Sequence, residues 1–346
     1  MRKFFVKFFW LKQAELKSRG IAVGLFFLFF LTFDTMEKWL LQARMQKGLS
    51  LLPFAHRLNY LFLQKSEYGK ILPAAYYMSR LLLLRDHLLA GEQYLKGEKG
   101  KIRILETGTG LHPFTCIGLY LAGYNHITTL DTKKLITKHT LAQTLAVFRE
   151  QELLGTLRNY IPGADFERMQ TIHRLHENMK RMSVEEVLKE LGLRQITTKK
   201  LSALPFKSYS FDLLVSGNAL QEMSVSVLMH LIPELTRVLV PGGIASHVLD
   251  LRDQFSYIDE NISPLNYLKF SEEKWRSLTS KLVRQNRMRI NFYRHLFKAS
   301  GMEIGSEKNV KGEASQLEGM ELDLTFEGVP KEDLLVLASH LVLKRG

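Results

Sequence analysis

Residues 104–113 read ILETGTGLHP, and the fold class of the chain follows from what stands on either side of them. An apolar run that ends at Glu106 predicts a short buried strand, and Gly108 and Gly110 follow it directly. Glycines there let the backbone turn tightly and approach a ligand closely, because no side chain stands in the way. A dinucleotide-binding fingerprint would need a third glycine where Pro113 stands, so the pattern argues against a nicotinamide or flavin site.

Strand and helix patterns alternate outward from this turn. Strand patterns stand near residues 101–105, 126–131, 194–197, 211–217, 244–250, 302–310 and 337–345. Helical patterns stand at 113–123, 133–154 and 225–239, and the turn PGG at 241–243 precedes a strand. This alternation predicts an α/β fold with a Rossmann-like, doubly wound, seven-stranded sheet. The polar, helix-prone residues 155–193 are expected to form a helical insertion.

Asp131 ends the second predicted strand, 25 residues after Glu106. Ligands of doubly wound sheets bind at the carboxyl ends of the strands, so Asp131 and the glycine turn are expected at the same edge. A carboxylate there can accept hydrogen bonds from both hydroxyls of a ribose, which selects an unphosphorylated nucleoside. The alternative is a solvated aspartate at the end of a strand.

Residues 1–98 have a composition of their own and predict a helical N-terminal extension to a domain at 99–346. The first residues, MRKFFVKFFWLKQAELKSR, give a helix with one apolar and one basic side. The uncharged run at 21–33 would span roughly 20 Å as a helix, short of the ~30 Å hydrocarbon core, so a transmembrane crossing is not expected. A helix buried against the rest of the protein and an in-plane membrane anchor both stay open.

The composition of the 346-residue chain is that of a folded globular protein, with 46% hydrophobic and 24% charged residues. Lysine and arginine exceed aspartate and glutamate by 48 to 35, and the net charge of +13 favours an anionic neighbour. The only cysteine, Cys116, excludes a disulfide within the chain and a cysteine-based metal centre, so no metal site is expected. This composition fits a reducing, cytoplasmic setting.

Two later stretches complete a set of four ordered motifs. LSALPFKSYSFDLLVSGNALQEM occupies residues 201–223, and ELTRVLVPGG occupies 234–243. With these, the chain resembles the large class of S-adenosylmethionine-dependent methyltransferases, in which a Leu-Pro-Phe turn precedes a Phe-Asp strand and a helix ends in Pro-Gly-Gly. The resemblance covers about residues 100–346.

Within this class the chain is similar to bacterial methyltransferase-like proteins of undefined substrate. Their glycine loop runs into a His-Pro pair, as residues 110–113 do, and they have segments like DLRDQF at 250–255 and NRMR at 286–289. Such proteins often have an Asp-His pair where this chain has Asp253 and Gln254, so no histidine role is carried over at that point.

The resemblance implies S-adenosylmethionine as the cofactor. It implies that Glu106, Gly108 and Gly110 surround the methionine part of the cofactor, while Asp131 holds the ribose. His112 would be a further contact to the cofactor or a residue at the start of the next helix.

The resemblance also implies that Leu201 lines the adenine. Three residues would close the pocket at the end of the fourth strand: Ser216, Gly217 and Asn218. One departure concerns Lys200, which stands where the class has an acidic residue that hydrogen-bonds the adenine amino group. A lysine only donates hydrogen bonds, so it cannot accept one from that amine.

Methyl transfer from a sulfonium is an in-line displacement, so orientation of the two reactants is the main requirement. A hydroxyl or protonated amine acceptor also needs a general base. The candidates lie near the ends of the fourth and fifth predicted strands: Glu222, His247, Asp250 and Asp253. Each has the alternative of a helix cap, a salt-bridge partner or a solvated charge.

Basic residues are concentrated in KWRSLTSKLVRQNRMRINFYRHLF, residues 274–297. This stretch either binds phosphate groups of a substrate or nucleic acid, or forms a solvated helical face. Because the chain has no recognised nucleic-acid module, a nucleic-acid partner is less favoured.

The sequence thus predicts a methyltransferase that acts on a small-molecule, saccharide or lipid acceptor. The alternative is a catalytically inactive methyltransferase-fold protein that serves as a binding or scaffold protein at a membrane. The expected location is the cytoplasm, with contact to the inner, anionic face of the cell membrane if the extension is an anchor.

Overall fold

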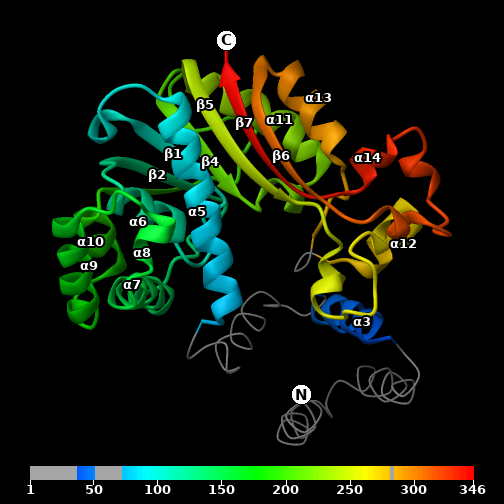
Figure 1. The fold of residues 1–346 in the computed structure, drawn as a ribbon, viewed down its shortest axis with the longest axis horizontal. Coiled ribbons are helices and arrows are strands. Elements are labelled where there is room, and N and C mark those ends of the chain that lie inside the picture. The colour runs from blue at the N-terminus through cyan, green and yellow to red at the C-terminus, as the bar shows by residue number, and fades with distance from the viewer. Residues whose placement is uncertain (1–36, 51–71, 281–283) are drawn as a thin grey trace, which may run out of the picture.

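A seven-stranded sheet forms the centre of the protein (Figure 1). The computed structural model describes residues 37–50, 72–280 and 284–346. In spatial order the strands are β3 (Leu193–Thr197), β2 (His126–Asp131), β1 (Arg103–Thr107), β4 (Phe211–Gly217), β5 (Leu239–Asp250), β7 (Val336–Arg345) and β6 (Met302–Lys311). The first five run parallel, and β7 is antiparallel to both β5 and β6. The predicted Rossmann-like, doubly wound α/β fold is confirmed.

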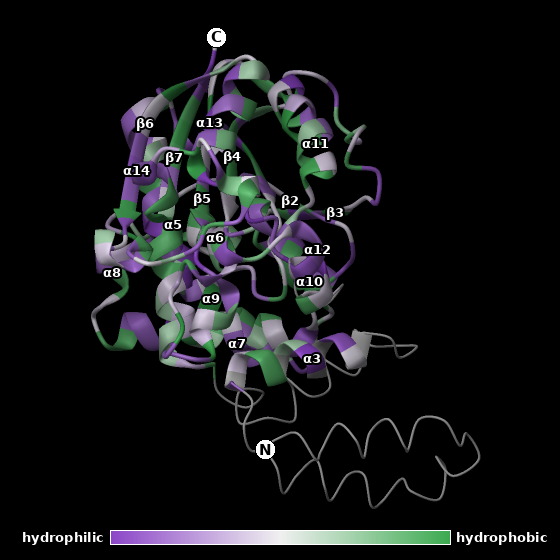
Figure 2. Ribbon diagram, turned by 90° about the vertical axis from the view of Figure 1, so that its right-hand side faces the viewer, coloured by the Kyte–Doolittle hydropathy of each residue, from purple (hydrophilic) through white to green (hydrophobic). Residues whose placement is uncertain are grey.

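Successive residues of a strand point to opposite faces of the sheet, and the strands have apolar residues on both faces. Helices therefore cover both faces of the sheet. In β1, Ile104 belongs to one buried cluster and Leu105 to the other. The first face is covered by α5 (Ala74–Tyr94), α6 (Phe114–Leu121) and α7 (Lys138–Leu153). The second face is covered by α11 (Val225–Val238) and α13 (Ile290–Ala299). Figure 2 shows hydrophobic residues concentrated in the strands between these helical layers.

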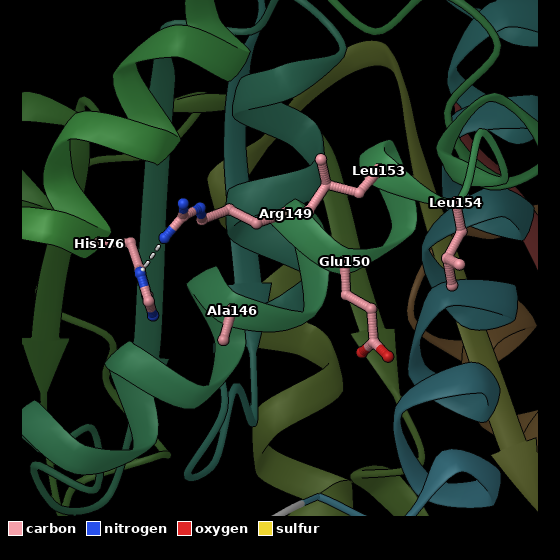
Figure 3. A pocket seen from close by; sticks show the side chains of 6 residues that line it. All are labelled: Ala146, Arg149, Glu150, Leu153, Leu154 and His176. Atoms are coloured by element: carbon pink, nitrogen blue, oxygen red, sulfur yellow. Dashed lines mark hydrogen bonds between the residues drawn. The ribbon is translucent and has the colours of Figure 1, made fainter.

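The segment between α7 and β3 is helical, as the sequence predicted for the insertion. It contains α8 (Leu157–Tyr160), α9 (Phe166–Asn178) and α10 (Val184–Glu190). Arg149 of α7 donates a hydrogen bond of 2.5 Å to Nδ1 of His176 in α9. These two residues, with Leu153 and Leu154, line a surface hollow between the helices (Figure 3).

The fifth strand begins earlier than the sequence indicated. The turn at 241–243 was expected to separate a helix from a strand at 244–250, but β5 already pairs with β4 at Leu239. The register between β4 and β5 then shifts, and Gly242 adopts a φ of +74°. Because glycine tolerates this left-handed conformation, the Pro-Gly-Gly sequence forms an irregularity within the strand instead of a turn before it.

The N-terminal part of the chain contributes two described helices. In α3 (Lys38–Ser50), Trp39 packs against Phe255, in a third buried cluster that also includes residues of α12 (Glu272–Leu278) and α14 (Lys331–Leu334). By contrast, α5 belongs to the sheet, since its Leu81, Leu84 and Leu88 lie in the same cluster as β1 and β4. The division of the chain near residue 98 stays a prediction, but it falls between a helix and the sheet that this helix covers.

Short 3-10 helices complete the chain: Lys99–Lys101, η3 (Leu220–Glu222), η4 (Gln254–Tyr257), Asn266–Lys269, Ala314–Leu317 and Leu324–Phe326. Within the described ranges, no helix combines the length and the apolar character needed to cross a membrane. The segments proposed to contact a membrane, at residues 1–33, lie outside the described residues. Their role therefore stays a prediction.

Candidate functional site

The turn after β1 presents two glycines in left-handed conformations, with φ values of +76° at Gly108 and +75° at Gly110. The amide of Gly108 donates to the Leu130 carbonyl over 2.9 Å, which ties the turn to β2. A Cβ on Gly108 would stand 2.5 Å from the Cβ of Ala219, whereas a Cβ on Gly110 would meet no atom within 4 Å. Gly108 is therefore pressed against the protein, and Gly110 borders open space.

Glu106 supports this glycine bend from inside the protein. Its carboxylate is buried and accepts hydrogen bonds of 2.7 Å from the Thr109 hydroxyl and from the Cys116 thiol. Burial raises the pKa of Glu106, while these donors and the nearby positive charge of Arg80 oppose the rise. Both bonds are made by Oε2, and through them Glu106 links the loop to α6.

Asp131 points toward the same bend from the end of β2. Its Oδ2 accepts a hydrogen bond of 3.3 Å from the amide of Gly110. Burial, together with the charge of Glu106, raises the pKa of Asp131 to about 7, although the Gly110 amide opposes this rise. Among the described residues Oδ1 has no hydrogen-bond donor, so it is free to bind a ligand hydroxyl.

The end of β4 lies beside the bend, but not all three of its predicted residues can offer a side chain to a ligand. The hydroxyl of Ser216 is buried in the core, 2.7 Å from Nδ1 of His247. The chain continues through Gly217 to Asn218, and the backbone N–H of Asn218 donates to the Val248 carbonyl over 2.9 Å. Asn218 has a φ of +56°, a conformation that asparagine tolerates better than most residues. The Ser216 side chain therefore does not reach the ligand space.

The residues predicted to lie near adenine follow β3. Leu201 is partly buried and packs against the cluster beneath α11. Lys200 is exposed, and its backbone amide donates to the Thr198 hydroxyl over 3.1 Å. The Leu-Pro-Phe turn that follows is fixed by Glu234, which accepts from the Leu204 amide over 2.6 Å. Nothing in this segment supplies the missing acidic partner of an adenine amino group.

His112 connects the glycine bend to two helices. Its Nδ1 lies 3.1 Å from the hydroxyl of Tyr76 in α5, and its Nε2 lies 3.2 Å from Oε1 of Gln143 in α7. A neutral ring satisfies both contacts if Nε2–H donates to Gln143 and Nδ1 accepts from Tyr76. Burial lowers the pKa of His112, which favours this neutral form. The ring thus fixes the position of the loop between α5 and α7.

Two residues of the site were missed by the sequence analysis, namely Tyr76 and Arg80 of α5. The Arg80 guanidinium lies over the Tyr76 ring, 5.2 Å from its centroid, and its Nη1 is 3.5 Å from the carbonyl of Gly217. The only signal in the sequence is the four-residue spacing, which places both on one face of a helix. Because that helix was assigned to the N-terminal extension, it was not connected to the pocket.

Among the four candidate bases, Glu222 belongs to the segment that follows Ala219, which packs against the bend. The helix η3 starts directly after Ala219, which packs against Gly108, and Glu222 is its last residue. The Glu222 side chain is exposed to solvent. Partial desolvation raises the pKa of Glu222, and the charge of Arg80 opposes this. A carboxylate in this position can take a proton from an acceptor and release it to water.

The other three candidates are engaged elsewhere. His247 is fully buried and stacks on Phe297 at 5.1 Å, and burial lowers its pKa to about 3. Asp250 accepts hydrogen bonds from Arg252 and Tyr257. Asp253 is buried and caps η4, and burial raises its pKa to about 6. The structure therefore does not bring these three together with Glu222.

The basic stretch 274–297 does not form one continuous cationic face. Arg287 and Arg289 are buried, with side chains directed into the protein. Arg294 pairs with Glu307 and Asp333 over 2.6 and 2.8 Å. Three of the basic side chains that were candidates for binding phosphate groups are therefore buried or paired within the protein.

Part of the chain that follows the bend matches a known protein family. Residues 170–246 match a family model described as a methyltransferase domain. No curated protein matches the chain. The match spans β3, β4, α11 and the first part of β5, and so contains both the Leu-Pro-Phe and Pro-Gly-Gly motifs. The resemblance to S-adenosylmethionine-dependent methyltransferases is confirmed, and S-adenosylmethionine is the cofactor that goes with it.

Solved structures with a similar arrangement include an S-adenosylmethionine-dependent methyltransferase from Mesorhizobium loti, 15% identical, with a TM-score of 0.38 over 75% of this chain and 98% of that one. A SAM-dependent methyltransferase from Methanosarcina mazei is 14% identical, with a TM-score of 0.40 over 73% of this chain and 95% of that one. The PH0226 protein from Pyrococcus horikoshii is 14% identical, with a TM-score of 0.46 over 82% and 98%.

The residues at the bend fit an adenosyl cofactor. Open space borders Gly110, where a side chain would otherwise stand, and the Asp131 carboxylate that accepts from the Gly110 amide has a second oxygen without a donor among the described residues. The Asn218 side chain makes no hydrogen bond to any residue in the described part of the chain, so its amide is available to a ligand. A nucleoside with free ribose hydroxyls therefore finds acceptors and room at this edge of the sheet.

Proposed function

We propose that this protein is an S-adenosylmethionine-dependent methyltransferase that transfers a methyl group to an acceptor by in-line displacement. The observation that carries the proposal is the pairing of Gly110 with Asp131, which combines open backbone with a carboxylate held 3.3 Å from the Gly110 amide. The match to a methyltransferase domain supports it independently, because that match begins after the glycine bend.

The chain's own residues have distinct tasks in this proposal. The Asp131 carboxylate accepts the ribose hydroxyls, and the glycine bend lets the ligand lie against the backbone. Glu106 and His112 keep the bend in place through their protein contacts. Leu201 offers an apolar surface to the adenine. Together they fix the ligand so that one direction of attack is open, which can lower the barrier by on the order of 7 to 11 kcal/mol.

When bound, S-adenosylmethionine would supply an electrophilic methyl group to the acceptor and would leave as the neutral thioether S-adenosylhomocysteine. Glu222 is the base we propose, because it alone of the four candidates adjoins the bend and keeps contact with solvent. Its carboxylate takes the proton that the acceptor hydroxyl or ammonium loses. His247 and Asp253 stabilise the core and the η4 turn instead.

Turnover is tested with methyl-labelled S-adenosylmethionine and fractionated pools of small metabolites, saccharides and lipids. We expect the wild-type chain to label one class of acceptor. Glu222→Gln should lower that labelling by roughly 100- to 10,000-fold while S-adenosylhomocysteine binds as before. Binding of the cofactor without labelling of any pool would instead favour the inactive scaffold protein. Full activity of Glu222→Gln would remove Glu222 as the base.

For the acceptor and the location, we propose a small-molecule, saccharide or lipid substrate, met in the cytoplasm or at the inner face of the cell membrane. The support is the basic aromatic segment at residues 1–19 and the net charge of +13. The full chain, but not a version starting at residue 37, should then sediment with anionic vesicles at low salt. Equal sedimentation of the two proteins would contradict the membrane contact.

A further inference from the structure

Arg80 is a half-buried cation that lacks a counter-ion in the described part of the chain. Its one hydrogen bond, to the Gly217 carbonyl, is long at 3.5 Å. No described carboxylate forms an ion pair with it, although its charge opposes the rise that burial causes in the pKa of both Glu106 and Glu222. A guanidinium carries five N–H donors, so most of the hydrogen-bonding capacity of Arg80 is left for a ligand.

The position of Arg80 is set by its surroundings. Tyr76, one helical turn earlier, lies beneath the guanidinium, and its hydroxyl reaches His112 at the end of the glycine bend. The helix itself is held close to α6, because Gly118 leaves the space that the Leu84 side chain enters. Arg80 is therefore held at the end of β4 by the Tyr76 ring beneath it and by the packing of its own helix.

The charges around the bend are otherwise acidic. Glu106, Asp131 and Glu222 all lie at this edge of the sheet, and the first two are buried. An adenosyl cofactor carries an amino-acid end with a carboxylate, which these acidic groups would repel. A cation is needed to hold that carboxylate, and a planar guanidinium can bind it through two parallel hydrogen bonds.

We propose that Arg80 binds the carboxylate of the methionine part of the cofactor, so that α5 is one wall of the cofactor site. This inference rests on the proposed function, since it requires the adenosyl end to lie at Gly110 and Asp131. The resemblance implies that the methionine part lies around Glu106 and the two glycines. The contact of Arg80 with the Gly217 carbonyl, at the end of β4, puts the guanidinium at the same edge of the sheet. The cofactor site then includes a helix from the segment assigned to the N-terminal extension.

The test compares two ligands on the full chain by isothermal titration calorimetry. S-adenosylhomocysteine has the amino-acid end, whereas methylthioadenosine lacks it and keeps the adenosine. We expect Arg80→Gln to weaken S-adenosylhomocysteine binding by about 10- to 100-fold and to leave methylthioadenosine binding unchanged. Arg80→Lys should recover part of the loss, because it keeps the charge but not the two-pronged geometry.

Arg85→Gln is the matched control, since Arg85 lies on an exposed position of the same helix and should change neither affinity. Equal S-adenosylhomocysteine affinity in Arg80→Gln and the wild type would overturn the inference. An equal loss for both ligands would also overturn it, because Arg80 would then act through the shape of the pocket. If the wild type binds neither ligand, the proposed function itself fails.

Discussion

Arg80 and Arg289 are both shielded cations, yet they lie in opposite surroundings. Each terminal nitrogen of Arg289 makes two hydrogen bonds, to the carbonyls of Leu251, Leu334 and Val336 and to the Tyr267 hydroxyl. Arg80 has a single long contact beside the glycine bend. Both are arginines in helix-prone, apolar surroundings of the sequence, so residue type does not separate them. What separates them is whether the protein itself occupies the terminal nitrogens of the guanidinium, as it does for Arg289 but not for Arg80.

This difference divides the molecule into a framework and a site. In the framework beneath α13, the terminal nitrogens of Arg289 and the guanidinium of Arg294 bond to groups of the protein, and changes there should alter stability. At the glycine bend, donors and acceptors are left for a ligand, and changes there should alter binding. The predictions below set the two regions against each other.

Replacing Arg289 should have the largest effect, and only on stability. Arg289→Met removes the donor shared by several buried carbonyl oxygens, and we expect the free energy of unfolding to fall by about 3 to 5 kcal/mol. Urea denaturation measures this loss. Arg276→Met is the control, because Arg276 is 77% exposed, pairs with Glu272 at the surface, and should cost less than about 1 kcal/mol. Similar losses in the two variants would contradict the division.

The two glycines of the bend should differ in what their replacement damages. Gly108→Ala combines a left-handed conformation with a 2.5 Å clash against Ala219, and should destabilise the fold by roughly 2 to 4 kcal/mol. Gly110→Ala carries only the conformational strain, roughly 1 to 2 kcal/mol, but places a methyl group in the ligand space. Denaturation and S-adenosylhomocysteine titration on both variants test this. A larger loss of stability in Gly110→Ala than in Gly108→Ala would contradict the conclusion that Gly110, and not Gly108, borders open space.

The framework should lose stability in acid. Since the pKa of His247 falls from about 6.5 in the unfolded chain to about 3 in the fold, the folded state holds the neutral ring. Its contribution is complete above pH 6.5 and is lost as the pH falls toward 3, which amounts to about 2 kcal/mol between pH 7 and pH 5. Denaturation at several pH values gives the free energy of unfolding as a function of pH. Between pH 5 and pH 6 its slope should correspond to about one proton less in His247→Asn than in the wild type. An unchanged slope would show that the ring titrates normally.

The site should respond to pH through binding. The pKa of Asp131 is about 7, so its carboxyl is mostly protonated at pH 6 and mostly ionised at pH 8. Only the ionised form accepts from both ribose hydroxyls, and the affinity for S-adenosylhomocysteine should rise about tenfold between these values. Burial of Asp131 also disfavours its ionised form in the folded state, so its contribution to the free energy of unfolding falls as the pH rises from about 4 to 7. Ligand affinity and this contribution to stability therefore change in opposite directions with pH. A pH-independent affinity in the wild type would contradict this, and Asp131→Asn should show none of the rise.

The sheet was predicted well because its strands are short apolar runs bounded by turn residues. The strands at 126–131 and 211–217 have the predicted bounds. The start of β5 was not predicted, because Gly242 can form either a turn or a bulge, and only pairing with β4 decides between them. Local sequence therefore determines where strands lie, while pairing determines where they begin.

The candidate site was predictable only where its residues adjoin strand ends. Gly110 and Asp131 could be placed at one edge, since parallel strands end on the same side. Arg80 could not, because a helix far from the motifs gives no sign of which strand end it meets. The separation of Glu222 from His247 also depends on which side chains become buried, and this is set by packing between distant segments.

The central claim is that Asp131 and the glycine bend hold an adenosyl cofactor, and calorimetric titration of S-adenosylhomocysteine into the full chain and into Asp131→Ala tests it most directly. The wild type should bind one molecule per chain, and Asp131→Ala should bind it about 10- to 100-fold more weakly, because charge-assisted hydrogen bonds to the ribose are lost. Equal affinities, or no binding by the wild type, would contradict the claim.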